Sequence, residues 1–312
     1  MQERERFLRT FLITIAVTAT SVVIASMSIA SGRPNAWLAG AVAATLALGG
    51  LSAYWLVRVV YRNPVSMTIA LVGFRASGKT VYVTVLFDML QRQRAGRIMF
   101  APYGAETVER VSGDLSGMSF GKWPPATPIG SVFFYTAQAS VSKGLGFLRR
   151  RYKLRVADYA GEHMAELDPT SAQWLHRTSY FKTVVESEAI IMTVDCATLV
   201  AGVKSDIDDM QNAYIAALQI LAEAKGATAD RKLRAPVALL FLKADVLAGR
   251  MKESEAMAAM ERLLEVCEGR CRYFESYFVS SVGQVQDQRR PPSEIRPHNV
   301  VEPIGWILDH LA

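Results

Sequence analysis

Eight consecutive residues, Gly73 to Thr80, have the types and spacing of a phosphate-binding loop. They fit G-x-x-x-x-G-K-[ST], in which glycines let the backbone approach phosphates and peptide N–H groups point at the negative charge. The pattern assigns Lys79 to the β- and γ-phosphates of a nucleoside triphosphate, and the Thr80 hydroxyl to Mg²⁺. We therefore predict nucleotide contacts from Gly73, Phe74, Arg75, Ala76, Ser77, Gly78, Lys79, Thr80 and Val81.

A second motif, D-x-x-G from Asp158 to Gly161, follows an apolar strand predicted at 150–157. At a strand end that faces the loop, the Asp158 carboxylate is expected to hold Mg²⁺ through a water molecule. The Gly161 N–H is expected to donate to a γ-phosphate and so to sense its presence. D-x-x-G alone is a weak pattern, but its place after a phosphate loop and a β-hairpin makes it informative.

A third motif could read a base. Lys243 and Asp245 follow another apolar strand, and a carboxylate there can accept hydrogen bonds from guanine N1–H and N2–H₂, a pair of donors that adenine lacks. The Lys243 stem would lie over the base plane. Ser280 and Ser281 close the next strand, where backbone N–H groups could reach the guanine O6. The alternative is that Lys243 and Asp245 are ordinary strand-exit residues.

These motifs need a sheet whose strand ends meet at one edge. Alternation of strands and helices after residue 66 predicts a three-layer α/β domain with a mostly parallel six-stranded sheet. With the phosphate-binding loop after its first strand, such a domain resembles the P-loop NTPase fold. Two of the strands form an antiparallel hairpin, and residues 94–130 are predicted to be a long functional or mobile loop. The predicted strands are 67–72, 131–140, 150–157, 188–195, 236–242 and 273–280, and the predicted helices are 79–93, 171–182, 205–225, 252–268 and 301–311.

In this order, the motifs resemble those of the Ras-like (TRAFAC-type) P-loop GTPases over residues 66–312. The resemblance implies GTP and GDP as ligands, Mg²⁺ as cofactor, and two loops that GTP orders and hydrolysis releases. It also implies a threonine that closes over Mg²⁺. We assign this role to Thr127, which precedes the strand at 131, because Thr136 lies too deep in that strand. The metal ligands are then Thr80, Thr127 and Asp158.

Three residues depart from the Ras-like pattern. Glu162 stands where these proteins usually place the glutamine that orients the attacking water, so hydrolysis is expected to be slow without a partner, or assisted by His163. Leu242 replaces the usual Asn or Thr before Lys243, which removes a polar tie to the phosphate loop. Arg75 could stabilise charge in cis, block the water or point outward. The expected catalytic residues are Glu162, Lys79, Arg75 and Thr127.

The loop at 73–80, Asp158–Glu162 and the Pro-x-Thr-Pro motif at 125–128 are also similar to the bacterial double-GTPase group, whose members are associated with conflict and defence gene neighbourhoods. The tail at 297–306 is similar to theirs as well. In architecture, a membrane anchor on a Ras-like domain also resembles the β-subunit of the signal-recognition-particle receptor.

The anchor is predicted from residues 1–62. Two uncharged runs of 23 residues, Thr10–Gly32 and Asn35–Val57, are each long enough to cross a membrane, with helices at about 10–32 and 36–57. Arginines flank the pair on the outside, which places both termini in the cytoplasm and makes the protein a two-span protein of the bacterial inner membrane. The alternative is a signal peptide with Ser28-Ile29-Ala30 as a weak cleavage site.

Composition limits the partners. The net charge of +6 falls to +2 once residues 1–62 are left out, so the chain is not expected to bind nucleic acid. The predicted partners are a guanine nucleotide, the lipid bilayer, an unidentified protein effector and a second copy, because small residues in the second run permit close helix packing. The three cysteines are interpreted as structural thiols. Alternatives to a GTPase switch are a GTP-binding scaffold with little hydrolysis and an ATPase.

Overall fold

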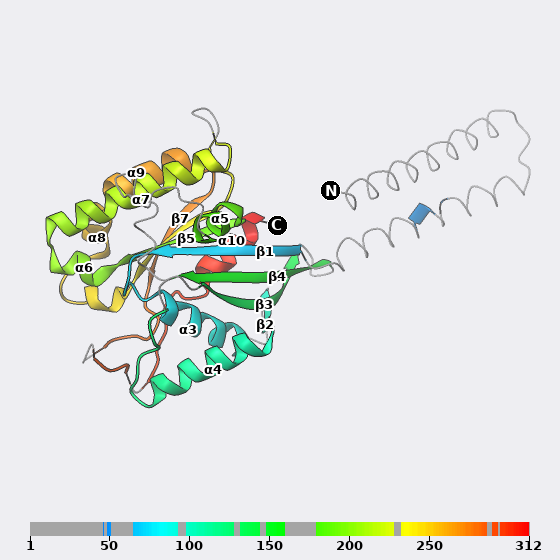
Figure 1. The fold of residues 1–312 in the computed structure, drawn as a ribbon, viewed down its shortest axis with the longest axis horizontal. Helices are drawn as coiled ribbons and strands as arrows, with labels where there is room; N and C mark the ends of the chain where they lie inside the picture. The colour runs from blue at the N-terminus through cyan, green and yellow to red at the C-terminus, as the bar shows by residue number, and fades with distance from the viewer. Residues whose placement is uncertain are drawn as a thin grey trace, which may run out of the picture. The chain divides into compact units, whose positions relative to one another are not determined.

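The computed structural model describes residues 46, 49–50, 65–92, 98–127, 132–143, 148–159, 179–227, 232–285, 289–292 and 294–311. Residues Val65–Ala312 form a compact unit that is separate from Met1–Pro64 (Figure 1). The predicted membrane hairpin lies almost wholly outside the described residues. Within the described ranges, no helix combines the length and the apolar character that a membrane span requires.

The centre of the domain is a seven-stranded mixed sheet in the order β2-β3-β4-β1-β5-β6-β7. Strands β4, β1, β5, β6 and β7 run parallel to one another, and β2, β3 and β4 are antiparallel neighbours. The prediction of six strands was therefore wrong by one. The strands are β1 (Val65–Gly73), β2 (Ile98–Pro102), β3 (Val132–Lys143), β4 (Leu148–Tyr159), β5 (Ala189–Asp195), β6 (Val237–Leu242) and β7 (Phe274–Val279).

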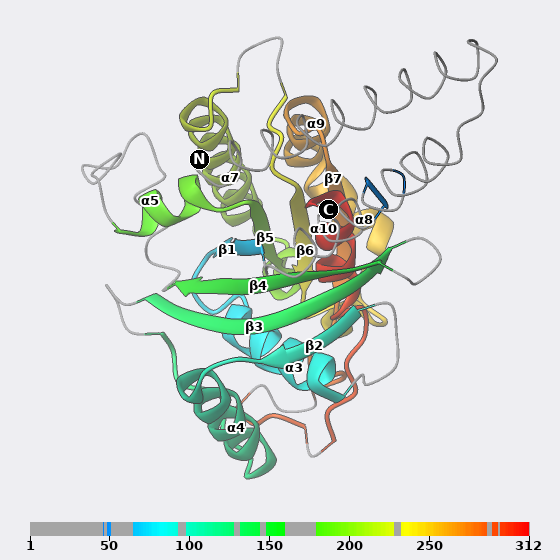
Figure 2. The ribbon, with the colours of Figure 1, turned by 90° about the vertical axis from the view of Figure 1, so that its right-hand side faces the viewer.

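Helices cover both faces of the sheet (Figure 2). Strand β1 shows why, because Ile69 and Leu71 belong to one buried apolar cluster while Ala70 and Val72 belong to the other. A strand buried on both faces carries a continuous apolar run, as parallel strands do. The first cluster packs against α3 (Lys79–Arg92), α4 (Ala105–Ser119) and α10 (Glu302–Leu311), and the second against α5 (Ser179–Glu186), α6 (Cys196–Ala201), α7 (Lys204–Ala224), α8 (Glu253–Ala259) and α9 (Glu261–Arg270).

The extra strand lies in the segment 94–130, which was predicted to be a loop. This segment contains β2 and α4 instead. Its buried residues Thr107, Val111, Asp114 and Met118 recur at helical spacing, but two of them are polar and Gly113 and Gly117 interrupt the pattern. Weak amphipathic patterning of this kind hides a helix whose stability comes from tertiary packing.

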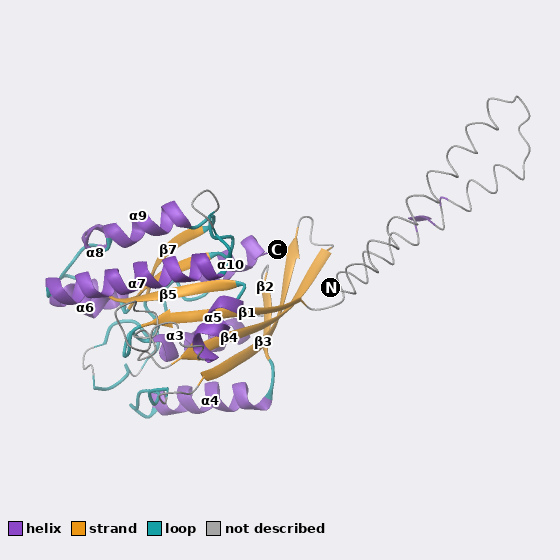
Figure 3. Ribbon diagram, turned by 45° about the horizontal axis from the view of Figure 1, so that its top comes forward, coloured by secondary structure: helices purple, strands orange, loops and turns teal. Residues whose placement is uncertain are grey.

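Two helix predictions also need revision. The helix predicted at 252–268 is two helices, α8 and α9, which meet at Met260. Of the helix predicted at 171–182, only the end is described, as the first residues of α5. Helix α6 was not predicted, and the other predicted strands and helices agree with the structure to within a few residues (Figure 3).

The topology brings the motifs together at one edge. Gly73 ends β1, Asp195 ends β5, and Lys243 and Ser280 directly follow β6 and β7. Asp158 pairs with Leu71 near the ends of β4 and β1. These are all carboxyl ends of parallel strands, which is where open α/β sheets form their ligand sites.

Candidate functional site

The phosphate-type loop turns tightly between β1 and α3. Ala76 and Gly78 both have positive φ, at 60° and 95°, a conformation that glycine adopts without strain. The loop is tied to the sheet by a hydrogen bond of 3.1 Å between the hydroxyls of Ser77 and Thr193. Buried Lys79 donates from Nζ to the carbonyl oxygens of Gly73 and Phe74, at 2.8 and 2.6 Å. The ammonium group is thus held inside the curve of the loop.

The close packing of Thr193 leaves room only for glycine at position 73. A Cβ atom at this position would lie 2.0 Å from Thr193 Oγ1, so Gly73→Ala is expected to destabilise the domain by about 1–3 kcal/mol. Urea unfolding followed by circular dichroism measures the change. Gly113→Ala is the matched control, because nothing lies within 4 Å of its Cβ in α4, and helix propensity predicts a gain of about 1 kcal/mol. Equal stability of Gly73→Ala and the wild type would contradict the close approach.

Three oxygen-bearing side chains meet beside the loop. Thr80 and Thr127 both donate to Asp158 Oδ2, at 2.9 and 3.1 Å, and their hydroxyls are 3.5 Å apart. Asp158 is fully buried, and its Oδ1 has no hydrogen-bond partner among the described residues. Burial raises the pKa of this carboxyl, and the Thr80 hydrogen bond and the Lys79 charge oppose the rise.

This corner fits a divalent cation. A buried carboxylate oxygen without a partner is costly unless something compensates it. Two hydroxyls and a carboxylate are hard oxygen ligands, which suit Mg²⁺ better than softer metals. The three residues predicted as metal ligands, Thr80, Thr127 and Asp158, are thus side by side, although 31 to 78 residues separate them in sequence.

Lys243 joins three parts of the site. Its Nζ donates to the Ala76 carbonyl in the phosphate loop at 2.8 Å and to Asp195 Oδ2 at 2.6 Å. The other oxygen of Asp195 accepts from Ala197 N at the start of α6, which fixes the carboxylate. Leu242 was expected to remove a polar tie to the phosphate loop, and Lys243 itself supplies such a tie.

Asp245 is oriented by the loop after β7. Ser280 Oγ donates to Asp245 Oδ1 at 2.8 Å and accepts from Gly283 N at 3.0 Å. The Ser280 hydroxyl is therefore committed to Asp245, whereas Ser281 lines the cavity described next. The structure brings Lys243, Asp245 and Ser281 together in the lining of that cavity.

A cavity of about 450 Å³ connects these groups, a size typical of ligand sites. It is lined by Arg75–Val81, Trp123–Thr127, Ala197, Leu242, Lys243, Asp245, Val246, Ser281, Val282 and Val285. Phe74 instead packs edge-on against Tyr214, with ring centroids 5.4 Å apart. Gly161, Glu162 and His163 lie outside the described residues.

Sequence reasoning missed three residues of this site. Thr193 and Asp195 end the strand predicted at 188–195, and a polar residue at the carboxyl end of a buried strand was a signal that could have found them. Trp123 lines the cavity next to Pro124 and Pro125, and its signal was its nearness to Thr127. The polar strand end and the position of Trp123 point to the site only once it is known which strand ends lie next to the phosphate loop.

Comparison with known proteins agrees with this geometry. The model of the Double-GTPase 2 family matches residues 67–289, which run from β1 to beyond β7 and include every site residue described above. No curated protein matches the chain.

Proposed function

We propose that this chain, which belongs to the Double-GTPase 2 family, binds GTP with Mg²⁺ in the cavity and hydrolyses the γ-phosphate slowly as a molecular switch. Family membership implies guanine-nucleotide binding and GTP hydrolysis. The observation that carries the proposal is the convergence of Thr80, Thr127 and Asp158 beside the phosphate-type loop, with a buried oxygen that lacks a partner.

The chain's own groups account for phosphate binding. Backbone N–H groups of the loop and the Lys79 ammonium would receive the β- and γ-phosphates, and Lys79 would exchange its loop carbonyls for phosphate oxygens. Thr80, Thr127 and Asp158 would hold Mg²⁺, which when bound neutralises charge on the phosphate oxygens. The Thr127 hydroxyl already lies 3.1 Å from Asp158 Oδ2, so Mg²⁺ held at this corner would tie the segment that carries Thr127 to the nucleotide.

A second group of cavity-lining residues supports base recognition. Asp245, held by Ser280, would accept from guanine N1–H and N2–H₂, and the Lys243 stem would cover the base. The ion pair with Asp195 and the bond to Ala76 hold that stem against the phosphate loop. Gly161 and Glu162 keep their predicted roles toward the γ-phosphate and the attacking water. Of the three roles predicted for Arg75, we propose the first, stabilisation of developing charge, because Arg75 lines the cavity.

We further propose that the switch is anchored by residues 10–57 at the cytoplasmic face of the membrane and signals to a protein effector. Sequence alone supports this part of the proposal, through the two uncharged runs and their flanking arginines.

Nucleotide affinity of the full chain in detergent tests the assignment, with GTP, GDP and ATP in the presence of Mg²⁺. Wild type is expected to prefer guanine nucleotides. Asp245→Ala should lose this preference, by about 100-fold for two charge-assisted hydrogen bonds. Asp209→Ala, an exposed carboxylate in α7, is the control and should change nothing. Equal binding of ATP and GTP by the wild type would contradict guanine recognition, and absent turnover would favour a GTP-binding scaffold.

A further inference from the structure

One face of the antiparallel end of the sheet is basic, and no described helix covers it. In β4, Tyr152, Leu154 and Val156 are buried in the first apolar cluster, so the alternate residues Arg151, Lys153 and Arg155 all point to the opposite face. Arg151 and Lys153 are exposed and Arg155 is half-buried. The three cations therefore form a row along one strand.

Strands β3 and β2 extend this face and contribute no acidic residue to it. The register places Ser140 beside Arg151, Gln138 beside Lys153 and Thr136 beside Arg155. Beyond β3, Met99 pairs with Ser140 and is 43% exposed, and Tyr103 follows β2 and is 48% exposed. We call these residues the basic sheet face; they are Met99, Ala101, Tyr103, Thr136, Gln138, Ser140, Arg151, Lys153 and Arg155.

No described carboxylate forms an ion pair with the three cations. Lys153 and Arg155 instead lie over the rings of Tyr103 and Phe134, at 5.2 and 4.2 Å from the ring centroids. The nearby Glu188 carboxylate accepts from Thr68 N, at 2.6 Å. The described part of the domain thus supplies no ion pair to the positive charge on this face.

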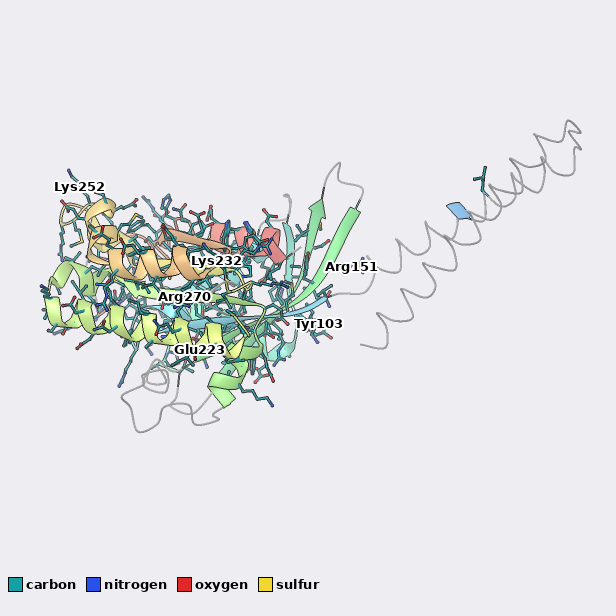
Figure 4. All side chains as sticks on the ribbon, turned by 90° about the horizontal axis from the view of Figure 1, so that it is seen from above. Tyr103, Arg151, Glu223, Lys232, Lys252 and Arg270 are labelled. Carbon is teal, nitrogen blue, oxygen red and sulfur yellow. The ribbon has the colours of Figure 1, made fainter. Side chains whose placement is uncertain are left out.

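The described helices leave this face uncovered. Helices α3 and α4 lie on the other side of β2, β3 and β4, and α5 and α7 lie beside β1 and β5 (Figure 2). Figure 4 shows Arg151 and Tyr103 at one end of the domain and Lys252 at the other. An antiparallel sheet with one solvated face is common, but such faces usually mix both signs of charge.

The chain enters the domain next to this face. Val65 and Ser66, the first residues of β1, pair with Tyr152 and Lys153. Only residues 58–64 separate β1 from the second uncharged run, a reach of about 25 Å at most. Whatever membrane that run enters is therefore within reach of Arg151 and Lys153.

From this charge and this place in the chain, we propose that the basic sheet face binds the headgroups of anionic lipids. The inference rests on the membrane anchoring in the proposed function. Cations near an anionic bilayer are attracted to it, whereas a neutral bilayer offers no such attraction. Docking of this face would fix the orientation of the domain, and with it the direction in which the nucleotide site faces.

Lysine acetylation of the full chain in lipid nanodiscs tests the proposal, with mass spectrometry as the readout. Lys153 is the reporter, and exposed Lys252 is the internal control. We expect acetylation of Lys153 to be about fivefold slower in discs that contain phosphatidylglycerol than in discs of phosphatidylcholine alone, the factor that one basic residue near an anionic surface supplies. Lys252 should react equally in both, and high salt should remove the difference.

A charge-reversal variant keeps the reporter. Gln138→Glu with Arg151→Glu makes the basic sheet face neutral in formal charge, and should abolish the protection of Lys153. Arg262→Glu with Arg270→Glu places the same kind of change on exposed positions of α9, keeps the internal control Lys252, and should leave the protection intact. Guanine-nucleotide binding, measured on the same discs, should be unchanged in both variants, because neither touches the cavity.

Three results would overturn the inference. Equal reactivity of Lys153 in both kinds of disc, or protection that survives the charge reversal, shows that the face does not contact anionic lipid. Protection of Lys153 by short single-stranded RNA, but not by anionic lipid, makes nucleic acid the partner. If the chain does not stay with the discs in high salt, the anchoring itself is wrong, a failure that co-elution distinguishes from these three results.

Discussion

Lys79→Met is expected to lower the affinity for GTP and GDP by about 100-fold or more, since it removes charge-assisted hydrogen bonds to the phosphates. The side chain is buried, and its Nζ already lies inside the phosphate-type loop, 2.8 and 2.6 Å from the Gly73 and Phe74 carbonyl oxygens. Methionine keeps the length of the stem and removes the charge. Titration with a fluorescent GDP analogue measures the loss.

The same substitution leaves two loop carbonyls without their donor, at a cost of about 1–3 kcal/mol. Circular dichroism and urea unfolding show whether the variant is folded at the assay temperature. Lys252→Met, on an exposed lysine, should bind like the wild type. Wild-type affinity in a folded Lys79→Met protein would mean that the phosphates do not sit in this loop.

Asp158→Asn is expected to stabilise the ligand-free domain while removing the Mg²⁺ dependence of nucleotide binding. The carboxylate is fully buried, its Oδ1 has no partner among the described residues, and burial raises its pKa above the ordinary value of 3.8. An asparagine carries no charge into that environment. We expect a gain of roughly 1–3 kcal/mol at neutral pH, measured by urea unfolding without nucleotide or metal.

The sign of the pH dependence follows from the raised pKa. Between the ordinary carboxyl range and the raised value, the folded state binds more protons than the unfolded state, so the stability of the ligand-free wild type falls as pH rises. Asp158→Asn should lack this fall. Mg²⁺ competes with the proton for the carboxylate, so apparent Mg²⁺ affinity should rise with pH across the same window.

Chelation of Mg²⁺ provides the functional readout for Asp158. It should weaken GDP binding by the wild type at least tenfold, as loss of a metal bound to both protein and phosphate would, and should hardly affect Asp158→Asn. Asp209→Asn, on the exposed surface of α7, should retain the full Mg²⁺ dependence. A Mg²⁺ response that survives in Asp158→Asn would place the metal elsewhere.

Local sequence determined the parts of this protein that are contiguous in the chain. The loop from Gly73 to Thr80 is identified by its residue types, because glycine, lysine and threonine at this spacing are typical of phosphate-binding loops and of few other structures. The strands β1, β5 and β6 are identified by their continuous apolar runs, at 69–72, 189–192 and 237–242, which show no polar alternation and are buried throughout. Both signals come from a few adjacent residues and do not depend on which other parts of the chain pack against them.

Tertiary structure decided what depends on neighbours in space. Helix α4 and strand β2 are stabilised by packing on α3 and β3. The buried face of α4 carries the polar residues Thr107 and Asp114, so the sequence lacks the apolar pattern that would have predicted this helix. Asp195 meets Lys243 only because β5 and β6 are adjacent and parallel. The basic sheet face exists because β2–β4 are antiparallel and covered by described helices on one side alone. Spacing along the chain carries no information on such contacts, since strand order sets them.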